Sequence, residues 1–473
     1  MVEREPFHDI DDIDAVEADT PGAPTTDRAA VPTTPPAWRY APDAWRWSHR
    51  LDRRSVDMIF RMRSARVIPA SVRQRFLAMG LPAETIDSTL GQIRGASAWA
   101  NQWIETAQRY LGEFRRQVSA SNLPEAAQAQ CLAALCYHAA QVFELDDPRI
   151  VLKCRAAAAS LFTRSLPYLH PNVRHIRIPW RAQSLPAYIR TPEPLTRPVG
   201  VVVILNGAST SKEETFAWSD RFIEQGYAVL ALDSPGTGEA TGVGEFLPDQ
   251  DDILDGFFEL FADEPMIDLR RVVVAGVSLG GNQAVRCATY DRRIMAAVAV
   301  TPPYEPARWI HRASPLLHQQ LGLLMSGQFD AEAAEHVAGF SLHEAAANSR
   351  QPLLVFGAGR DVIVPPAEAQ LLANRAGNRA TLVWQADGGH CLYEFIDEWT
   401  FEAATWITAV ADARQDPATR GDVVQIATHA RQVLSDTPYV PKPDPVPYGT
   451  GDESTEYARV IDHSAPADAN DAT

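Results

Sequence analysis

Short apolar runs alternate with stretches of helical composition from residue 199 to residue 385, and this alternation restricts the fold more than any other feature. The runs are VGVVVIL, YAVLAL, RVVVAG, AAVAVT, PLLVFG and ATLVWQ. Strands that are buried on both faces of a parallel sheet read as nearly continuous aliphatic runs, and the connections between them are helices. The alternation therefore predicts a mostly parallel, doubly wound α/β sheet covered by helices.

Two further strands are expected upstream, where the pattern changes at Asn172. The segments NVRHIRIPW and SLPAYIRT alternate apolar and polar side chains with a period of two. This period is typical of an antiparallel hairpin with one solvated face. The hairpin is expected at an edge of the sheet, which then has eight strands.

The chain from 38 to 167 has the pattern of an all-helical N-terminal domain. The segment SAWANQWIETAQRYLGEF repeats apolar side chains every three or four residues, as an amphipathic helix does. A second such segment, AAQAQCLAALCYHAAQVFEL, carries His138, for which a packing role is preferred to a catalytic one. The first stripe is expected to be core and comprises Trp99, Trp103, Ala107, Tyr110, Leu111 and Phe114.

The remaining boundaries follow from composition. The acidic, Pro- and Thr-rich arm 1–37 and the Pro-rich acidic tail 437–473 bury too little apolar surface to order, so we expect both to be disordered. The catalytic α/β domain is expected over 168–414. It contains a helical insertion at about 305–345 that forms part of a lid, and an extra C-terminal helix over 415–436 follows it.

Charge and cysteine content argue against several classes of protein. The formal net charge is −17, which disfavours a nucleic-acid or anionic-membrane partner. The 5 cysteines lack CxxC spacing, so neither disulfides nor zinc are expected. No signal peptide or apolar span is recognised, which favours a cytoplasmic location. No cluster has metal-ligand spacing, and the sequence predicts neither a metal nor a cofactor.

The segment RVVVAGVSLGGNQAV places a serine in a glycine-flanked turn. A β-branched run precedes the turn, and the stretch from Asn282 to Tyr290 has helical composition. One interpretation of Gly276, Ser278 and Gly280 is a plain strand-to-helix turn. The other is a nucleophile elbow, which raises the serine hydroxyl above the carboxyl end of the sheet.

An acid and a histidine follow this serine in the order Ser, Asp, His that is typical of α/β-hydrolases. Asp361 lies in the loop after PLLVFG, and His390 lies in the loop after ATLVWQ. Taken singly, Asp361 can also be read as the cap of the helix that begins near Pro366, and His390 as a loop histidine. Together, three residues at successive strand ends predict a triad of Ser278, Asp361 and His390.

A serine nucleophile also needs backbone donors for the oxyanion that forms. The N–H of Leu279, directly after the serine and at a helix N-terminus, is expected to be one donor. The loop LNGASTSKEE follows the first parallel strand. There Gly207 leaves space, and the amide of Ala208 is the expected second donor. The alternative is that this loop is a plain turn.

Four segments carry a resemblance to a branch of the α/β-hydrolases. It contains the esterases related to the fermentation-respiration switch protein, the 2,6-dihydroxypseudooxynicotine hydrolases and the fungal polyketide-shortening hydrolases. IPWRAQSLPAYIRTP resembles the family's entry hairpin, and LNGASTSKEET its Gly-Gly loop ending in Lys-Glu-Glu. LDSPGTGEA resembles its Asp-Gly-Pro-Gly-x-Gly-Glu segment, and GVSLGGNQAVRCA its elbow. The resemblance covers about Trp99 to Trp406.

The resemblance implies an α/β-hydrolase fold with an N-terminal all-helical cap. It also implies hydrolysis of an ester or of a carbon–carbon bond next to a ketone. Gly207 and Glu305 are the candidate substrate-binding residues: Glu305 directly follows a strand in TPPYEPARW, and a surface glutamate is the preferred alternative for it. Asn206 replaces the first glycine of the Gly-Gly pair, and Ser234 stands where glycine is usual. Asp233 and Glu239 are expected to organise their loop through hydrogen bonds.

The leading hypothesis is a cytoplasmic serine hydrolase that acts on a small aromatic or polyketide-like ketone or ester. An acyltransferase that uses the same acyl-enzyme is the alternative, followed by a non-catalytic, regulatory protein of the hydrolase fold. The partner is a small-molecule substrate. The helical domain is interpreted as a cap over the pocket, and a homodimerisation module is the competing interpretation.

Overall fold

The computed structural model describes residues 70–144, 147–313, 315–325 and 331–442. The predicted N-terminal arm 1–37 and nearly all of the predicted C-terminal tail lie outside the described residues. The described residues up to Pro441 belong to one compact unit. None of the helices in this part of the chain combines the length and apolar character needed to cross a bilayer.

One eight-stranded sheet organises the chain, in the order β1-β2-β4-β3-β5-β6-β7-β8. The first two strands pair antiparallel as a hairpin at one edge, and all strands from β3 onward run parallel. The predicted fold class and the edge hairpin are therefore confirmed. The strands are β1 (Val173–Trp180), β2 (Gln183–Arg190), β3 (Val199–Leu205), β4 (Ala228–Leu232), β5 (Ile267–Val277), β6 (Ile294–Val300), β7 (Leu353–Ala358) and β8 (Ala380–Gln385).

Helices cover both faces of the sheet. As a result, every residue of β3, β4, β6 and β7 is buried. Each face carries its own apolar cluster, as expected for a doubly wound sheet. One face packs against α10 (Asp255–Leu260), α11 (Leu279–Tyr290), α14 (His343–Asn348) and α15 (Ala367–Ala376). The other packs against α9 (Asp220–Glu224), α16 (Ile396–Gln415) and α17 (Val423–Asp436).

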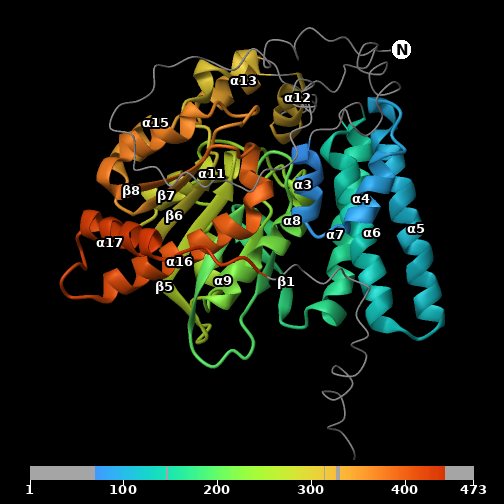
Figure 1. The fold of residues 1–473 in the computed structure, drawn as a ribbon, viewed down its shortest axis with the longest axis horizontal. Helices are drawn as coiled ribbons and strands as arrows, with labels where there is room; N and C mark the ends of the chain where they lie inside the picture. The colour runs from blue at the N-terminus through green and yellow to red at the C-terminus, as the bar shows by residue number, and fades with distance from the viewer. Residues whose placement is uncertain (1–69, 145–146, 314, 326–330, 443–473) are drawn as a thin grey trace, which may run out of the picture. The chain divides into compact units, whose positions relative to one another are not determined.

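The helices before the sheet share an aromatic core. They are α3 (Ala70–Ala78), α4 (Ala83–Leu90), α5 (Trp99–Ser119), α6 (Leu123–Val142) and α7 (Pro148–Leu169), and they are the blue to green-blue helices of Figure 1. Of the predicted stripe, Trp99, Trp103 and Ala107 are buried, and the later residues are half-buried. The core also takes in Tyr188 from β2 and Phe216 from α8 (Lys212–Phe216).

The segment between β6 and β7 forms a separate helical layer at the carboxyl end of the sheet. It contains α12 (Pro315–Leu324) and α13 (Ala331–Ala338), labelled in the upper part of Figure 1, and both contribute to one apolar cluster. Its apolar cluster joins Trp309, Leu321 and Phe340 to Leu279 of α11. The insertion therefore packs on the residue directly after the predicted nucleophile.

The described residues also contain short 3₁₀ helices. They are η3 (Ala96–Ala98), η4 (Ala217–Ser219), η5 (Gly238–Ala240), η6 (Pro306–Arg308), η7 (Ile310–Arg312), η8 (Gly377–Arg379) and η9 (His390–Phe395).

Candidate active site

Ser278 occupies a strained turn between β5 and α11. Its backbone has φ 53° and ψ −122°, outside the regions that residues with a Cβ ordinarily adopt. The turn is possible because glycines flank it: a Cβ on Gly280 would lie 2.6 Å from the carbonyl oxygen of Asn206 and would clash with that of Leu205. Ser278 itself is largely buried, with 9% of its surface exposed. This is the geometry of a nucleophile elbow.

Asp361 and His390 meet in a hydrogen bond. Asp361 follows β7, and its Oδ2 lies 2.8 Å from Nδ1 of His390. Its other oxygen accepts from the backbone N–H groups of Ile363 and Val364, at 2.8 and 2.9 Å. The carboxylate is therefore fixed on both sides and can hold the imidazole in one tautomer, with Nε2 as the acceptor.

Thr301 at the end of β6 links the loops of the serine and the histidine, and sequence reasoning did not single it out. The N–H of Ser278 donates to the Val300 carbonyl at 2.9 Å, one residue before Thr301. The Thr301 hydroxyl accepts from the N–H of Cys391 at 3.1 Å and lies 3.5 Å from Nδ1 of His390. Within the described residues, no hydrogen bond joins Ser278 Oγ to His390, as is common in structures without substrate.

The Asp361 carboxylate stabilises positive charge on His390. Burial by itself lowers the pKa of this imidazole, but the adjacent Asp361 carboxylate outweighs burial and raises the pKa from 6.5 to about 10. Asp361 is 2% exposed, so water screens this interaction weakly. The pair is thus arranged to stabilise an imidazolium, the form that appears when the histidine accepts a proton.

The predicted oxyanion loop lies against the elbow. A Cβ on Gly207 would come within 3.3 Å of Cβ of Ser278 and 3.1 Å of the Val277 carbonyl oxygen, so only glycine allows this approach without displacement. Ala208 packs on the same apolar cluster as Leu279. The two predicted backbone donors, Leu279 and Ala208, therefore border one region next to the serine.

The two departures from the family pattern are accommodated by side-chain hydrogen bonds. Asn206 donates through Nδ2 to Asp233 Oδ1 at 2.7 Å. Ser234 donates to Gln283 Oε1 on α11 at 3.1 Å. Asp233 also accepts from the N–H groups of Lys212 and Glu239, at 2.7 and 2.9 Å. Asp233 thus ties its own loop to the segment that follows β3, which agrees with the organising role expected for it.

A buried ionic cluster lies behind the oxyanion loop. Lys212 is 0% exposed, and its Nζ lies 2.7 Å from Glu213, 3.1 Å from Asp233 and 2.9 Å from Glu239. Burial acts against the ammonium, but the surrounding carboxylates outweigh it and raise the pKa of Lys212. A run such as Lys-Glu-Glu ordinarily faces water, so sequence reasoning gave no sign of this cluster.

Glu305, the possible substrate-binding residue, is anchored at the base of the insertion. Its N–H donates to Glu368 Oε2 at 2.7 Å, and its Oε1 accepts from the hydroxyl of Ser341. Glu305 is half-buried and is the residue before η6, but its side chain makes no capping hydrogen bond to that helix. These bonds hold Glu305 between the end of β6 and the insertion.

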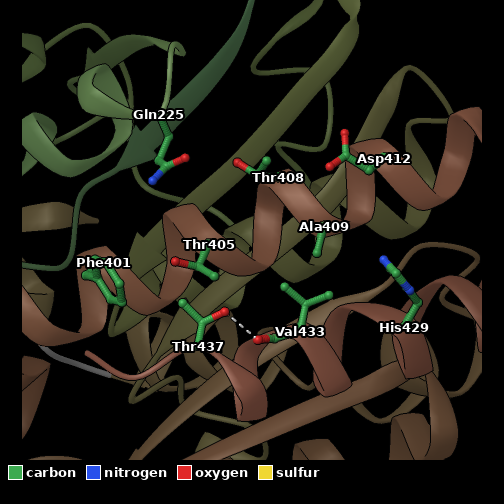
Figure 2. A pocket seen from close by; sticks show the side chains of 9 residues that line it. All are labelled: Gln225, Phe401, Thr405, Thr408, Ala409, Asp412, His429, Val433 and Thr437. Carbon is green, nitrogen blue, oxygen red and sulfur yellow. Dashed lines mark hydrogen bonds between the residues drawn. The ribbon is translucent and has the colours of Figure 1, made fainter. Parts of the chain in front are cut away.

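A pocket of about 280 Å³ lies elsewhere, between α16 and α17 (Figure 2). It is lined by Gln225, Phe401, Thr405, Thr408, Ala409, Asp412, His429, Val433 and Thr437. None of the predicted site residues lines it, so it is separate from the serine site. Among the described residues, no group of three or more His, Cys, Asp or Glu side chains is suited to hold a metal ion.

The chain is similar to known hydrolases in sequence and fold. Residues 202–404 match the family described as "Alpha/beta hydrolase family". A 2,6-dihydropseudooxynicotine hydrolase of Paenarthrobacter nicotinovorans is 24% identical over 326 residues, which cover 68% of this chain and 88% of the relative. The "Hydrolase pyiE" of Pyricularia grisea is 31% identical over 225 residues, 44% of this chain. The chain covers 48% of that fungal protein's length, about half.

A solved structure has the same fold. The crystal structure of a 2,6-dihydroxy-pseudo-oxynicotine hydrolase aligns with a TM-score of 0.63 at 23% identity, covering 71% of this chain and 94% of that one. The coverage exceeds the span of the sheet, so the alignment takes in part of the preceding helices as well. With its strained serine turn, its eight-stranded sheet and these similarities, the chain is an enzyme with the α/β-hydrolase fold, and its residues 202–404 match the alpha/beta hydrolase family.

Proposed function

We propose that this hydrolase is a serine enzyme that cleaves an ester or a carbon–carbon bond next to a ketone in a small aromatic or polyketide-like substrate. The observation that carries the proposal is the combination of Ser278 in a strained elbow with the 2.8 Å contact between His390 and Asp361. A serine hydroxyl is a weak nucleophile and requires such a positioned base.

In the first step, Ser278 Oγ attacks the substrate carbonyl carbon while its proton passes to Nε2 of His390. The carbonyl π electrons move onto oxygen, and the N–H groups of Leu279 and Ala208 receive the resulting oxyanion. The imidazolium forms beside the Asp361 carboxylate, which favours the charge. The same carboxylate raises the pKa of His390, which supports this role.

In the second step, the bond between the carbonyl carbon and the leaving group breaks. An ester releases an alkoxide, and a ketone substrate releases an enolate; His390 returns its proton to either. Water then attacks the acyl-enzyme, with His390 again as base, and frees the acid and Ser278. Protonation by His390 neutralises the enolate. Glu305 is our candidate for a contact to another, hydrogen-bond-donating part of the substrate.

The apolar side chains beside the nucleophile indicate the class of substrate. The insertion contributes Trp309, Leu321 and Phe340 to the apolar cluster that contains Leu279. An apolar wall beside the nucleophile suits an aromatic or extended acyl group and keeps water from a carbanion-like leaving group. We further propose that the N-terminal helices act as the cap of this pocket.

The experiment combines labelling with product analysis. A fluorophosphonate is expected to label wild-type enzyme on the peptide that contains Ser278, and Ser278→Ala is expected to prevent labelling. Aryl 1,3-diketones and matched aryl esters are then supplied, and release of a carboxylic acid together with a ketone from the diketone identifies carbon–carbon cleavage. An adduct on another residue, or wild-type turnover by Ser278→Ala, would contradict the proposal.

The same assay separates hydrolysis from acyl transfer. With an added alcohol or amine, a hydrolase releases the free acid, whereas an acyltransferase gives the new ester or amide. A dominant transfer product would replace our proposal by the alternative. The helical cap is tested in the same series with substrates of increasing acyl length.

A further inference from the structure

Arg75 on α3 crosses from the helical region into the hydrolase domain. It is 7% exposed. Its guanidinium donates two hydrogen bonds to the Glu214 carboxylate of α8, from Nε to Oε1 at 2.9 Å and from Nη2 to Oε2 at 2.7 Å. Such paired contacts fix the plane of a guanidinium. His138 of α6 binds the same carboxylate, with 2.7 Å between Nε2 and Oε2. The guanidinium is therefore held rigidly before any contact to the site is considered.

The free edge of this guanidinium binds Ser209 at two points. Nη2 donates to the Ser209 carbonyl at 2.9 Å, and Nη1 donates to the Ser209 hydroxyl at 3.1 Å. Gln141 of α6 adds a bond from Nε2 to the same carbonyl at 3.3 Å. Two helices from outside the sheet domain therefore fix one residue of the loop that follows β3.

Ser209 directly follows Ala208, whose N–H is the proposed oxyanion donor. On the other side of Ala208, Gly207 is packed against Ser278, and the Thr210 hydroxyl donates to the Gly207 carbonyl at 3.3 Å. Each peptide plane is shared by two residues, so fixing the atoms on both sides of Ala208 restricts where its N–H points. The donors of an oxyanion hole contribute most when they are aimed before the charge forms.

The histidine loop touches the same guanidinium. Cζ of Arg75 lies 5.5 Å from the centre of the Tyr393 ring, within the range of a cation–π contact. Tyr393 is buried in η9, which begins at His390. Arg75 thus contacts both loops that the proposed reaction needs in register, the loop of Ala208 and the loop of His390.

We propose that Arg75 is a positioning residue that aims the Ala208 amide at the oxyanion and holds the histidine loop in register with it. The inference rests on the proposed function, since it assigns a role within that site. It also gives the N-terminal helices a task beyond covering the pocket, because α3 and α6 supply the groups that shape the oxyanion loop. Arg75 touches no reacting atom and acts only through Ser209 and Tyr393.

The test measures binding of a transition-state analogue. A trifluoromethyl ketone forms a serine hemiketal whose oxyanion occupies the donor site, so its Ki reports on the aim of the donors. In Arg75→Met we expect Ki to rise and kcat/KM on a p-nitrophenyl ester to fall by a common factor of about 10 to 100, somewhat less than removal of a donor costs. In Arg75→Lys, one ammonium cannot serve both Glu214 and Ser209, and an intermediate loss is expected.

Arg414→Met is the matched control for lost stability. Arg414 is half-buried and also donates to a backbone carbonyl, that of Met295 at 2.9 Å, but at the opposite end of β6. We expect this variant to lower the Tm while leaving Ki unchanged. A folded Arg75→Met or Arg75→Lys with Ki within about twofold of wild type would overturn the inference.

The labelling experiment distinguishes failure of the proposed function from failure of the role proposed for Arg75. If the fluorophosphonate fails to modify Ser278 in the wild-type enzyme, the proposed function fails, whatever Arg75 does. If Ser278 is modified and Ki is the same in all variants, the site is catalytic and only the role of Arg75 is wrong.

Discussion

Glu214 offers a quantitative test of the contact between the helical region and the sheet. Burial by itself raises the pKa of this carboxyl, but Arg75 and His138 outweigh burial and lower the pKa from 4.5 to about 2. The difference corresponds to about 3 kcal/mol of stability at neutral pH, at about 1.4 kcal/mol per pKa unit. Because the folded-state pKa is the lower one, this contribution is complete above pH 4.5 and is lost as the pH falls towards 2.

We therefore expect Glu214→Gln to reduce the free energy of unfolding by about 3 kcal/mol at pH 7. Between pH 7 and pH 3.5, the difference between wild type and Glu214→Gln should shrink by about 1.4 kcal/mol, because this carboxylate becomes protonated in the unfolded wild-type chain while it stays ionised in the folded one. The assay is urea unfolding of the full chain, followed by tryptophan fluorescence at a series of pH values.

Asp87→Asn is the matched control. Asp87 on α4 pairs at 2.7 Å with Arg73, which lies on the same helix as Arg75, but the Asp87 side chain is 56% exposed. Exposed ion pairs contribute about 0 to 1 kcal/mol, so the variant should unfold nearly as wild type does. The reasoning is refuted if Glu214→Gln matches this control at pH 7, or if its stability keeps a constant offset from wild type down to pH 3.5.

Three further outcomes are expected. Asp361→Asn should fold normally, lose about 10⁴ in kcat and move the acidic limb of the kcat/KM profile to lower pH, because the carboxylate that raises the pKa of His390 is gone; stopped-flow assays between pH 5 and 10.5 measure both changes. Gly280→Ala should lose about 1 to 3 kcal/mol by overpacking, since its Cβ would lie 2.6 Å from the Asn206 carbonyl oxygen, and thermal unfolding without a decrease in Tm would contradict this. Dialysis against EDTA should leave kcat/KM unchanged, and a loss that Zn²⁺ or Mg²⁺ restores would show that a metal takes part.

The sequence was sufficient for features that depend on local pattern. The strands were predictable because a strand buried on both faces leaves a continuous aliphatic run, as in Val199–Leu205. The meeting of Asp361 with His390 was predictable because parallel strands bring their carboxyl ends to one edge. The positions of Asp361 and His390 directly after successive strands of an expected parallel sheet were sufficient to predict this contact.

Features that depend on distant partners were not predictable. The run SKEET reads as a solvated start of a helix, yet Lys212 and Glu214 are buried, because Asp233 and Arg75 reach them from far away in the sequence. Thr301 carries no motif at all. Its position between the loops of the serine and the histidine becomes visible only when β5, β6 and β8 are placed in one sheet.

The shared aromatic core has a consequence for how such enzymes diversify. Phe162 of α7 packs against Tyr188 and Phe216 of the sheet half, with ring centres 5.4 Å apart in both pairs. Detaching the helices would expose the rings of Tyr188 and Phe216 to water. We therefore expect the N-terminal helices and the sheet domain to unfold in one calorimetric transition. Recombination between relatives that exchanges the helices without their aromatic partners would produce chains that fail to fold. New specificities are therefore easier to acquire in the insertion around α12 and α13 than by replacing the N-terminal helices.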